Sequence, residues 1–333
     1  MAGLVAAARA RELGAEPVVY EKGTRAGGSM LLSSGFVWRY RSVDVHLEQC
    51  PAADVALARM LVEQFDQALD WLESLGVELL TRETGNPLTV GGRFDPRQLV
   101  DTLGRDVRLG ETTAEPTILA TGGFPARLAR ERGLLPRANR WSDGDGLELA
   151  LARGAASVGD LGEFYGRAMP AVPDIAERDF VRFTQLYGRY ATVTSKDGRQ
   201  RFDGPPSWSE TDLVQQIARW PDGVAWYTVE RSDLGRRVRE RTVGEMIEAA
   251  REAGAPVHED DGSIRVLVRA SVTQTIGGVL IDERARALDD RGKPIEGLFA
   301  AGVDAGGWAT GGYASGLSAA LVFGRIAAES ALV

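Results

Sequence analysis

A strand, a glycine-rich loop and a helix are encoded in order by Gly297-Leu298-Phe299-Ala300-Ala301-Gly302-Val303-Asp304-Ala305-Gly306-Gly307 and Gly311-Gly312-Tyr313-Ala314-Ser315-Gly316-Leu317-Ser318. The apolar run before Gly302 predicts a short buried strand, and the helix is expected from about Tyr313 to Ser330. Glycines let a backbone approach a flat or charged ligand closely. The start of a helix favours an anion or a ring carbonyl. An ordinary strand–loop–helix crossover of any α/β protein explains this stretch equally well.

Composition and charge narrow the class of protein. The chain has 333 residues, a formal net charge of −8, 44% hydrophobic residues and 26% charged residues. An acidic chain of this kind is a poor partner for nucleic acid or an anionic membrane. No apolar run reaches the length of about 18 residues that a membrane span needs. The N-terminus does not resemble a signal peptide, so the sequence predicts a cytoplasmic protein.

Few residues are available for metal or hydrolase chemistry. The chain has one cysteine, Cys50, and two histidines, His46 and His258. An intrachain disulfide is therefore impossible, and a zinc site of cysteine and histidine ligands is not expected. A Ser–His–Asp hydrolase would have to use one of these histidines, and neither lies in a recognisable motif.

The N-terminal residues match the second half of a Rossmann βαβ unit. A helix over Met1–Leu13 and a strand over Pro17–Tyr20 are expected, and Glu21 follows the strand. An acid at this strand end normally binds a ribose hydroxyl of an adenine nucleotide. Gly3 can only be the last glycine of a G-x-G-x-x-G fingerprint. The first strand and two glycines are absent, which suggests a start assigned too late or a truncated domain.

A second glycine- and serine-rich loop comes directly after Glu21 and Lys22. Its amide and hydroxyl donors could wrap a pyrophosphate, although a solvated surface loop is the simpler explanation. Its position after the expected ribose acid favours the ligand. The residues concerned are Gly27, Gly28, Ser29, Ser33 and Gly35.

A further strand end carries polar residues near the middle of the chain. Pro116–Gly123 predicts a buried strand that runs into Thr121 and Gly122, and ligands bind at such ends in open α/β sheets. Asp145 precedes a helix expected over Leu147–Arg153. From the local sequence alone, capping of that helix is the better explanation of Asp145 than ligand binding.

Between Leu161 and Val268 the chain is richer in aromatic and charged residues, which indicates a second domain inserted into the nucleotide-binding fold. Strands are expected over Val181–Phe202, around a turn at Lys196-Asp197-Gly198. The helices expected in the whole chain, besides those already given, are Ala52–Leu75, Pro96–Leu103 and Thr242–Ala253.

Several motifs, taken in order, resemble the flavoproteins of the fumarate reductase/succinate dehydrogenase family. The resemblance is strongest to the soluble branch that contains 3-ketosteroid 1-dehydrogenases and tricarballylate dehydrogenase-like proteins, and it runs almost from end to end. The matching segments are Gly3 to Glu21, Gly27-Gly28-Ser29, Ala120-Thr121-Gly122-Gly123-Phe124, Gly144-Asp145-Gly146, Arg153-Gly154-Ala155, Phe164-Tyr165-Gly166, Gly198-Arg199-Gln200-Arg201-Phe202, Thr273-Gln274-Thr275-Ile276-Gly277-Gly278, Gly297 to Gly302, and Leu321-Val322-Phe323-Gly324-Arg325.

The resemblance implies an α/β fold in which a Rossmann-like FAD-binding domain, truncated at its N-terminus, carries an inserted α+β capping domain that binds substrate. The FAD-binding domain would comprise 1–160 and 269–333, and the capping domain 161–268. No histidine lies between Gly27 and Gly35, where relatives with covalent flavin have one, so noncovalent FAD is expected. The implied cofactor-binding residues are Gly3, Glu21, Lys22, Gly27, Gly28, Ser29, Ser33, Gly35, Thr121, Gly122, Asp145, Gly302, Asp304, Gly312, Leu317 and Ser318.

The chain also departs from this family. Only 13 residues separate Leu103 from Thr117, where the family has a longer strand-rich excursion. Val303 replaces a common glutamate, and Gln274 replaces the histidine of fumarate reductases. No arginine occurs between Gly306 and Phe323. Because dicarboxylates need paired positive groups, the resemblance does not favour succinate or fumarate as substrate.

The resemblance implies hydride transfer to or from flavin N5 at a CH–CH bond next to a carbonyl or carboxylate, with a ketone, a steroid-like molecule or a carboxylic acid as substrate and an unknown electron acceptor. Tyr313 is the expected proton-transfer group, although a packing role explains it nearly as well. Tyr165, Arg167 and Gln274 are further candidates for the substrate site. A degenerate homologue with weak or no FAD binding and no turnover is the alternative. A flavin monooxygenase-like hydroxylase fits the C-terminal motifs less well.

Overall fold

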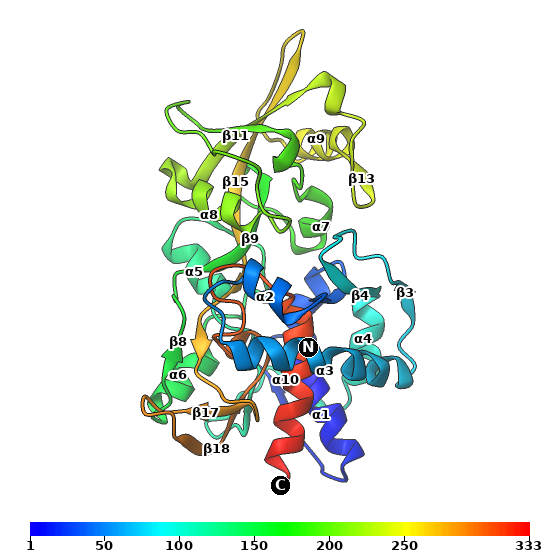
Figure 1. Cartoon of the computed structure of the whole chain (residues 1–333), viewed down its shortest axis with the longest axis vertical. Coiled ribbons are helices and arrows are strands. Elements are labelled where there is room, and N and C mark those ends of the chain that lie inside the picture. Colours follow the sequence, from blue (N-terminus) through cyan, green and yellow to red (C-terminus); the bar gives the residue numbers. More distant parts are fainter. The chain divides into compact units, whose positions relative to one another are not determined.

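Helix α10 (Gly316–Ala331) is the central helix of the first of two units that the computed structural model, which describes residues 1–333, contains. It packs against α1 (Ala2–Glu12) and α3 (Val55–Ser74), and Figure 1 shows α10 in red beside α1 in blue. A Cβ at Gly324 would lie 2.8 Å from the Ala2 carbonyl oxygen, so the absence of a side chain lets the helices approach closely.

Helix α10 begins at Gly316, three residues later than the sequence suggests. Ser315 has an extended backbone conformation, and its hydroxyl accepts a hydrogen bond from the Ser318 amide. Such a cap satisfies one of the free amides of the first turn and fixes where the helix starts. Tyr313 therefore lies in the loop before the helix rather than on it.

Two small sheets of the first unit present parallel strand ends. Strand β1 (Val19–Glu21) pairs in parallel with β5 (Val107–Leu109). In the other sheet the order is β17 (Arg286–Leu288), β18 (Pro294–Ala300) and β6 (Ile118–Leu119), with β18 and β6 parallel. Because parallel strands end on the same side of a sheet, the residues after β6 and β18 lie together.

The first unit comprises 1–124, 139–163 and 274–333. Its antiparallel sheet has the order β2-β4-β3, and β8 pairs with β16. No helix of the chain is long and apolar enough to cross a lipid bilayer. The other elements of this unit are β2 (Phe36–Tyr40), α2 (Val43–Gln49), β3 (Leu79–Thr81), β4 (Thr89–Phe94), α4 (Pro96–Leu103), α6 (Asp145–Ala152), β8 (Ser157–Val158) and β16 (Gly278–Val279).

The second unit comprises 125–138 and 164–273 and is built on a six-stranded sheet. Four strands follow the order β10-β11-β15-β14, while β7 and β9 also pair with β15. The last two residues of β15 belong to the first unit. The elements are α5 (Pro125–Glu131), β7 (Leu135–Pro136), β9 (Phe164–Pro170), α7 (Phe180–Phe183), β10 (Thr192–Ser195), α8 (Thr211–Arg219), β11 (Val224–Glu230), β12 (Arg237–Val238), β13 (Arg241–Thr242), α9 (Val243–Glu252), β14 (Val257–Glu259) and β15 (Ser263–Thr275).

The limits of this unit differ from the residues 161–268 that the sequence suggests. Strand β7 pairs in parallel with β15, with Leu135 opposite Ser271, and this pairing places Pro125–Ala138 in the second unit. Of the strands expected over Val181–Phe202, β10 and a bridge between Thr194 and Arg201 flank the predicted turn, whereas α7 takes up the first residues. The Thr184 hydroxyl donates to the Phe180 carbonyl at 2.7 Å and closes that helical turn.

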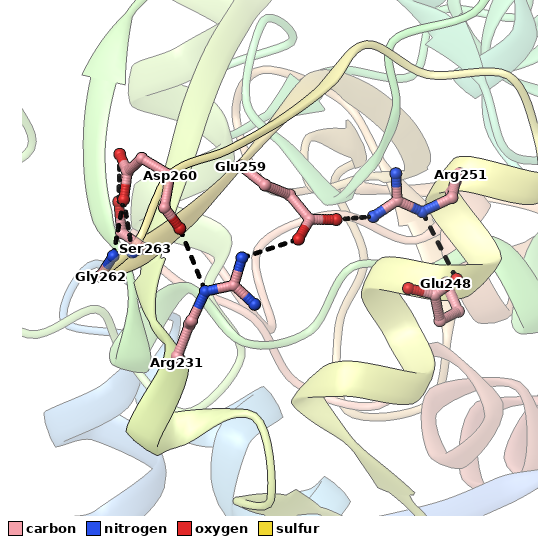
Figure 2. Close-up of polar contacts among 7 residues, drawn as sticks. All are labelled: Arg231, Glu248, Arg251, Glu259, Asp260, Gly262 and Ser263. Carbon is pink, nitrogen blue, oxygen red and sulfur yellow. Dashed lines mark hydrogen bonds and ion pairs between the residues drawn. The ribbon is translucent and has the colours of Figure 1, made fainter.

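An ionic network holds α9 to the turn between β14 and β15 (Figure 2). Glu259 accepts from both Arg231, at 2.8 Å, and Arg251. Asp260 accepts from the amides of Gly262, at 3.0 Å, and Ser263, at 2.6 Å, and so shapes the turn. The two guanidinium groups hold the pKa of Glu259 below its usual value. Because these side chains are exposed, the network fixes geometry more than it adds stability.

A buried carboxyl group lies in the second unit just before α8. Glu210 is 2% exposed and accepts a hydrogen bond from the Gly188 amide at 2.9 Å. Burial raises the pKa of Glu210 to about 7, although the nearby Arg167 guanidinium opposes the shift. The folded protein therefore binds a proton here that the unfolded chain releases at a lower pH.

The free energy of unfolding should fall as the pH rises from about 4.5 to about 7. Because the raised pKa of Glu210 belongs to the folded state, the cost of its charge is absent below this window and complete above it. Glu210→Gln removes the titration and should stabilise the protein by roughly 3 kcal/mol above pH 7. Urea denaturation between pH 4 and 8 measures this.

The matched control is Glu230→Gln, which changes an exposed glutamate of the same unit. It should keep the pH dependence of the wild type. An unchanged slope in Glu210→Gln would show that this carboxyl does not control the stability.

Candidate functional site

One carboxylate joins the ends of the parallel strands β6 and β18. Asp304 ends the short 3₁₀ helix η6 (Gly302–Asp304) after β18 and is 1% exposed. Its Oδ1 accepts from the Thr121 hydroxyl and from the Gly123 amide, both at 2.9 Å, and its Oδ2 accepts from the Thr121 amide. Burial raises the pKa of Asp304, while these donors oppose the shift.

The same junction fixes the start of α6. The Gly146 amide donates to the Thr121 hydroxyl at 3.2 Å. A Cβ at Gly146 would lie 2.6 Å from the Thr121 hydroxyl oxygen and 2.9 Å from Asp304 Oδ2, so only glycine fits there. Thr121 and Asp304, both expected to bind the cofactor, lie together at this junction, and their side chains bind each other.

Asp145 is the first residue of α6 and not its cap, because Gly144 takes the cap position with φ = 99°. The expectation of a capping Asp145 is wrong for this reason. Its carboxylate instead lies 2.7 Å from Lys22 Nζ, which is also 3.7 Å from Asp143. This ion pair joins the segment after β1 to the start of α6.

The loop after β1 is shaped by its own glycines and serines. Glu21 Oε1 accepts from the Gly23 amide at 2.7 Å. Gly27 is left-handed, with φ = 100°, and begins the 3₁₀ helix η1 (Gly28–Leu32). The Ser33 hydroxyl donates to the Met30 carbonyl and accepts from the Gly35 amide. A Cβ at Gly35 would lie 1.9 Å from the Phe94 carbonyl oxygen, so this loop is built for close backbone packing.

A line of hydrogen bonds joins this loop to the Asp304 junction. The Ser29 hydroxyl accepts from the Asn139 amide at 2.9 Å, the Ser142 amide donates to the Asn139 carbonyl, and the Ser142 hydroxyl donates to the Thr121 carbonyl. Asn139 Oδ1 is buried with no hydrogen-bond partner. The sequence does not single out Asn139, although the Ser142-Asp143-Gly144 turn was a usable signal for its region.

Small residues surround the start of α1. Gly302 is left-handed, with φ = 68°, and a Cβ there would lie 3.0 Å from Ala2 Cβ. A Cβ at Gly3 would lie 3.4 Å from Ala120 Cβ, and one at Gly122 would lie 3.1 Å from the Ser142 hydroxyl oxygen. Backbone groups at the start of α1 and at both strand ends are thus close together, which suits a phosphate-bearing ligand.

The Tyr313 loop is held against β2. The Tyr40 hydroxyl donates to the Tyr313 carbonyl at 2.7 Å, and the Tyr313 ring meets the Trp38 ring edge-on at 5.7 Å between centroids. The Ser318 hydroxyl donates to the Trp38 carbonyl at 2.5 Å, so this side chain binds β2. Leu317 beside it is half-buried. Sequence reasoning did not single out Trp38 and Tyr40, which contact the candidate residues Tyr313 and Ser318 and lie just after the Gly27–Gly35 loop.

Gln274 lies against the first turn of α10. A Cβ at Gly316 would lie 2.1 Å from Gln274 Oε1, and Gln274 Nε2 is buried with no hydrogen-bond partner. A Cβ at Gly312 would lie 1.9 Å from the Gln49 carbonyl oxygen, so this position in the loop also has no room for a side chain. An unpaired buried amide donor costs roughly 1–3 kcal/mol and marks a place where a ligand oxygen would be favourable.

Tyr165 and Arg167 belong to β9 of the second unit, whereas Tyr313 and Gln274 belong to the first. Arg167 is 4% exposed, donates to the Ser209 carbonyl at 2.6 Å and lies 5.0 Å from the Tyr165 ring centroid. Within their own unit, these two side chains have a packing role. No group of three or more histidine, cysteine, aspartate or glutamate side chains could hold a metal ion.

Comparisons with known proteins point in one direction. The family model described as FAD binding domain matches residues 1–105 and 96–320. A probable fumarate reductase of Shewanella frigidimarina is 24% identical over 436 residues, which cover 99% of this chain and 73% of the relative.

Solved structures share the fold. The open conformation of a flavocytochrome c3 fumarate reductase matches with a TM-score of 0.71 and 21% identity, over 99% of this chain and 76% of its own. A 3-ketosteroid Δ4-(5α)-dehydrogenase from Rhodococcus jostii RHA1, in complex with 4-androstene-3,17-dione, matches with a TM-score of 0.71 and 17% identity. The match covers 99% of this chain and 94% of that dehydrogenase.

Asp304→Asn should lower the free energy of unfolding by roughly 2–4 kcal/mol, because the new amide group faces donors that need an acceptor. Urea denaturation measures this loss. Asp289→Asn is the control, since Asp289 accepts from the Arg291 and Lys293 amides in an exposed turn. We expect it to change stability by less than about 1 kcal/mol. Equal effects of the two substitutions would contradict a special role of the buried junction.

Proposed function

The chain belongs to the FAD binding domain family, and from that premise we propose that it is a dehydrogenase or reductase acting on a CH–CH bond next to a carbonyl or carboxylate. The expected α/β fold and the FAD cofactor are confirmed by this family and by the solved relatives. The chain is thus an FAD-dependent oxidoreductase. The observation that carries the finer proposal is the buried Gln274 Nε2, which has no hydrogen-bond partner and lies against Gly316 at the start of α10, directly after the loop that carries Tyr313.

The residues of the first unit fit the cofactor. When bound, FAD accepts or supplies a hydride at N5. Glu21 would hold the adenosine ribose, and the loop from Gly27 to Gly35 would hold the pyrophosphate through backbone amides. The buried, unpartnered Asn139 Oδ1 next to this loop is an acceptor in need of a donor, which agrees with a ligand there. No histidine lies in the loop, so binding is noncovalent.

Tyr313 and Gln274 act on the substrate, the first by proton exchange and the second by hydrogen bonding. The Tyr313 phenol, on a loop fixed by Tyr40, exchanges the proton that accompanies hydride transfer. Gln274 Nε2 has no partner within the protein and donates to the substrate oxygen. Neutral donors suit the carbonyl of a ketone better than a dicarboxylate, which needs paired cations. No arginine lies between Gly306 and Phe323 to supply one.

A second candidate is a homologue that binds FAD weakly and turns over no substrate. The 13-residue connection between Leu103 and Thr117 favours it, because this connection is short compared with that expected of the family. The visible spectrum of the purified protein distinguishes the two proposed functions. A flavin absorbance that survives gel filtration supports the oxidoreductase. Absence of FAD, even after FAD is added, would sink it.

The FAD-loaded protein should be bleached without oxygen by a saturated ketone, and less by a dicarboxylic acid, because its carbonyl-facing donors are neutral. Anaerobic absorbance at the flavin band, with a steroid-like ketone, a simple cyclic ketone and succinate, measures the preference. Bleaching by succinate alone would contradict the assignment of Gln274 and Tyr313 to a ketone carbonyl.

Tyr313→Phe should lower kcat by about 10²–10⁴-fold, since it removes the proton-transfer group and leaves the backbone bond from Tyr40 in place. FAD affinity should stay unchanged, which a fluorescence titration checks. The control Tyr20→Phe alters an exposed tyrosine of β1 and should leave kcat unchanged. A Tyr313→Phe enzyme with wild-type kcat would assign Tyr313 to packing.

A further inference from the structure

Glu163 is bound to the loop that carries Tyr313. Its carboxylate accepts the Gly311 amide through both oxygens, at 2.9 Å and 3.2 Å. Gly311 is two residues before Tyr313 and is left-handed, with φ = 84°. A bond to a carboxylate is about twice as strong as one between neutral groups. The side chain of Glu163 therefore restrains the loop where its backbone turns.

The main chain of Glu163 is bound to the segment that carries Gln274. The Ile276 amide, two residues after Gln274, donates to the Glu163 carbonyl at 3.1 Å. One residue thus contacts both backbone segments from which the two candidate groups project. Glu163 is itself only half-buried, and no other part of the proposed function uses it.

Neutral contacts hold the other side of the loop. The Ala52 amide donates to the Thr310 carbonyl at 3.1 Å, and Tyr40 donates to the Tyr313 carbonyl at 2.7 Å. These bonds do not depend on pH near neutrality, whereas the bond from Gly311 depends on the charge of Glu163. The loop is therefore held by hydrogen bonds on two sides, and only the bond to the Glu163 carboxylate changes with pH.

We propose that Glu163 is a positioning residue that holds the Tyr313 loop to the segment that carries Gln274, and that protonation of its carboxylate loosens the loop. The inference rests on the roles proposed above for Tyr313 and Gln274. Glu163 itself contacts neither the substrate nor the flavin in this scheme.

The charges around Glu163 support this sensitivity. Burial raises the pKa of Glu163, the Gly311 amide opposes the shift, and the neighbouring Asp160 adds to it. The Cys50 thiol also faces Glu163, and burial raises the pKa of that thiol to about 12, so it stays neutral. As the pH falls through the raised pKa of Glu163, one oxygen becomes a hydroxyl and the charge-assisted bond is lost.

Hydrogen–deuterium exchange of the FAD-loaded protein tests, without any substrate, whether Glu163 restrains the Tyr313 loop. We expect the peptide that contains Gly311 to exchange about tenfold faster in Glu163→Ala than in wild type at the same pH, and Glu163→Gln to lie between them. The exposed Glu83→Gln variant is the control and should match wild type. Wild-type exchange in Glu163→Ala would overturn the proposal, whether or not the enzyme turns over.

The pH profile of kcat is the second readout. The kcat of the wild type should fall at low pH, because protonation of Glu163 weakens its bond to the Gly311 amide. Asp160→Asn should move this loss to lower pH, since one neighbouring negative charge is gone, and Glu163→Gln should abolish it while KM stays within about twofold. An acid limb that persists unchanged in Glu163→Gln would overturn the titration step. If no substrate is turned over, the proposed function fails while the exchange measurement still decides whether Glu163 holds the loop.

Discussion

The buried carboxylate of Asp304 is the constraint on which the first unit depends. A carboxylate removed from water is costly unless its oxygens accept hydrogen bonds, and here the donors come from Thr121 and Gly123, on the neighbouring strand end. Gly146 completes the junction because it has no side chain. Three segments that are far apart in the sequence are consequently held in one geometry. The same bonds fix the positions of the backbone groups that are expected to face the cofactor.

A second, aromatic arrangement holds the loop that carries Tyr313. The rings of Tyr313, Trp38, Tyr40 and His46 meet successively edge-on, and His46 contacts the Trp308 carbonyl at 2.7 Å. Edge-on contacts of this kind are directional and resist sliding. The loop before α10 therefore has little freedom, although it is rich in glycine. Its shape comes from neighbours on β2 and α2, and glycine permits the close approach.

The sequence predicts local features well and distant pairings poorly. Helix α4 appears at the predicted residues, because Asp95 caps it and Pro96 opens it, and both signals are local. The strand ends at Thr121 and Asp304 are also recognisable in the sequence, because each follows a short apolar run. Their mutual bonding spans 183 residues, and no pattern in either segment indicates it. Arg167, which follows the Phe164-Tyr165-Gly166 motif, is buried over the Tyr165 ring, and the sequence gives no sign of that burial.

The chain passes between its two units after residues 124, 138, 163 and 273. Each unit is therefore assembled from separated pieces of sequence, and no single cut releases either of them whole. Exchanging either unit for another domain would therefore require opening the chain at several points.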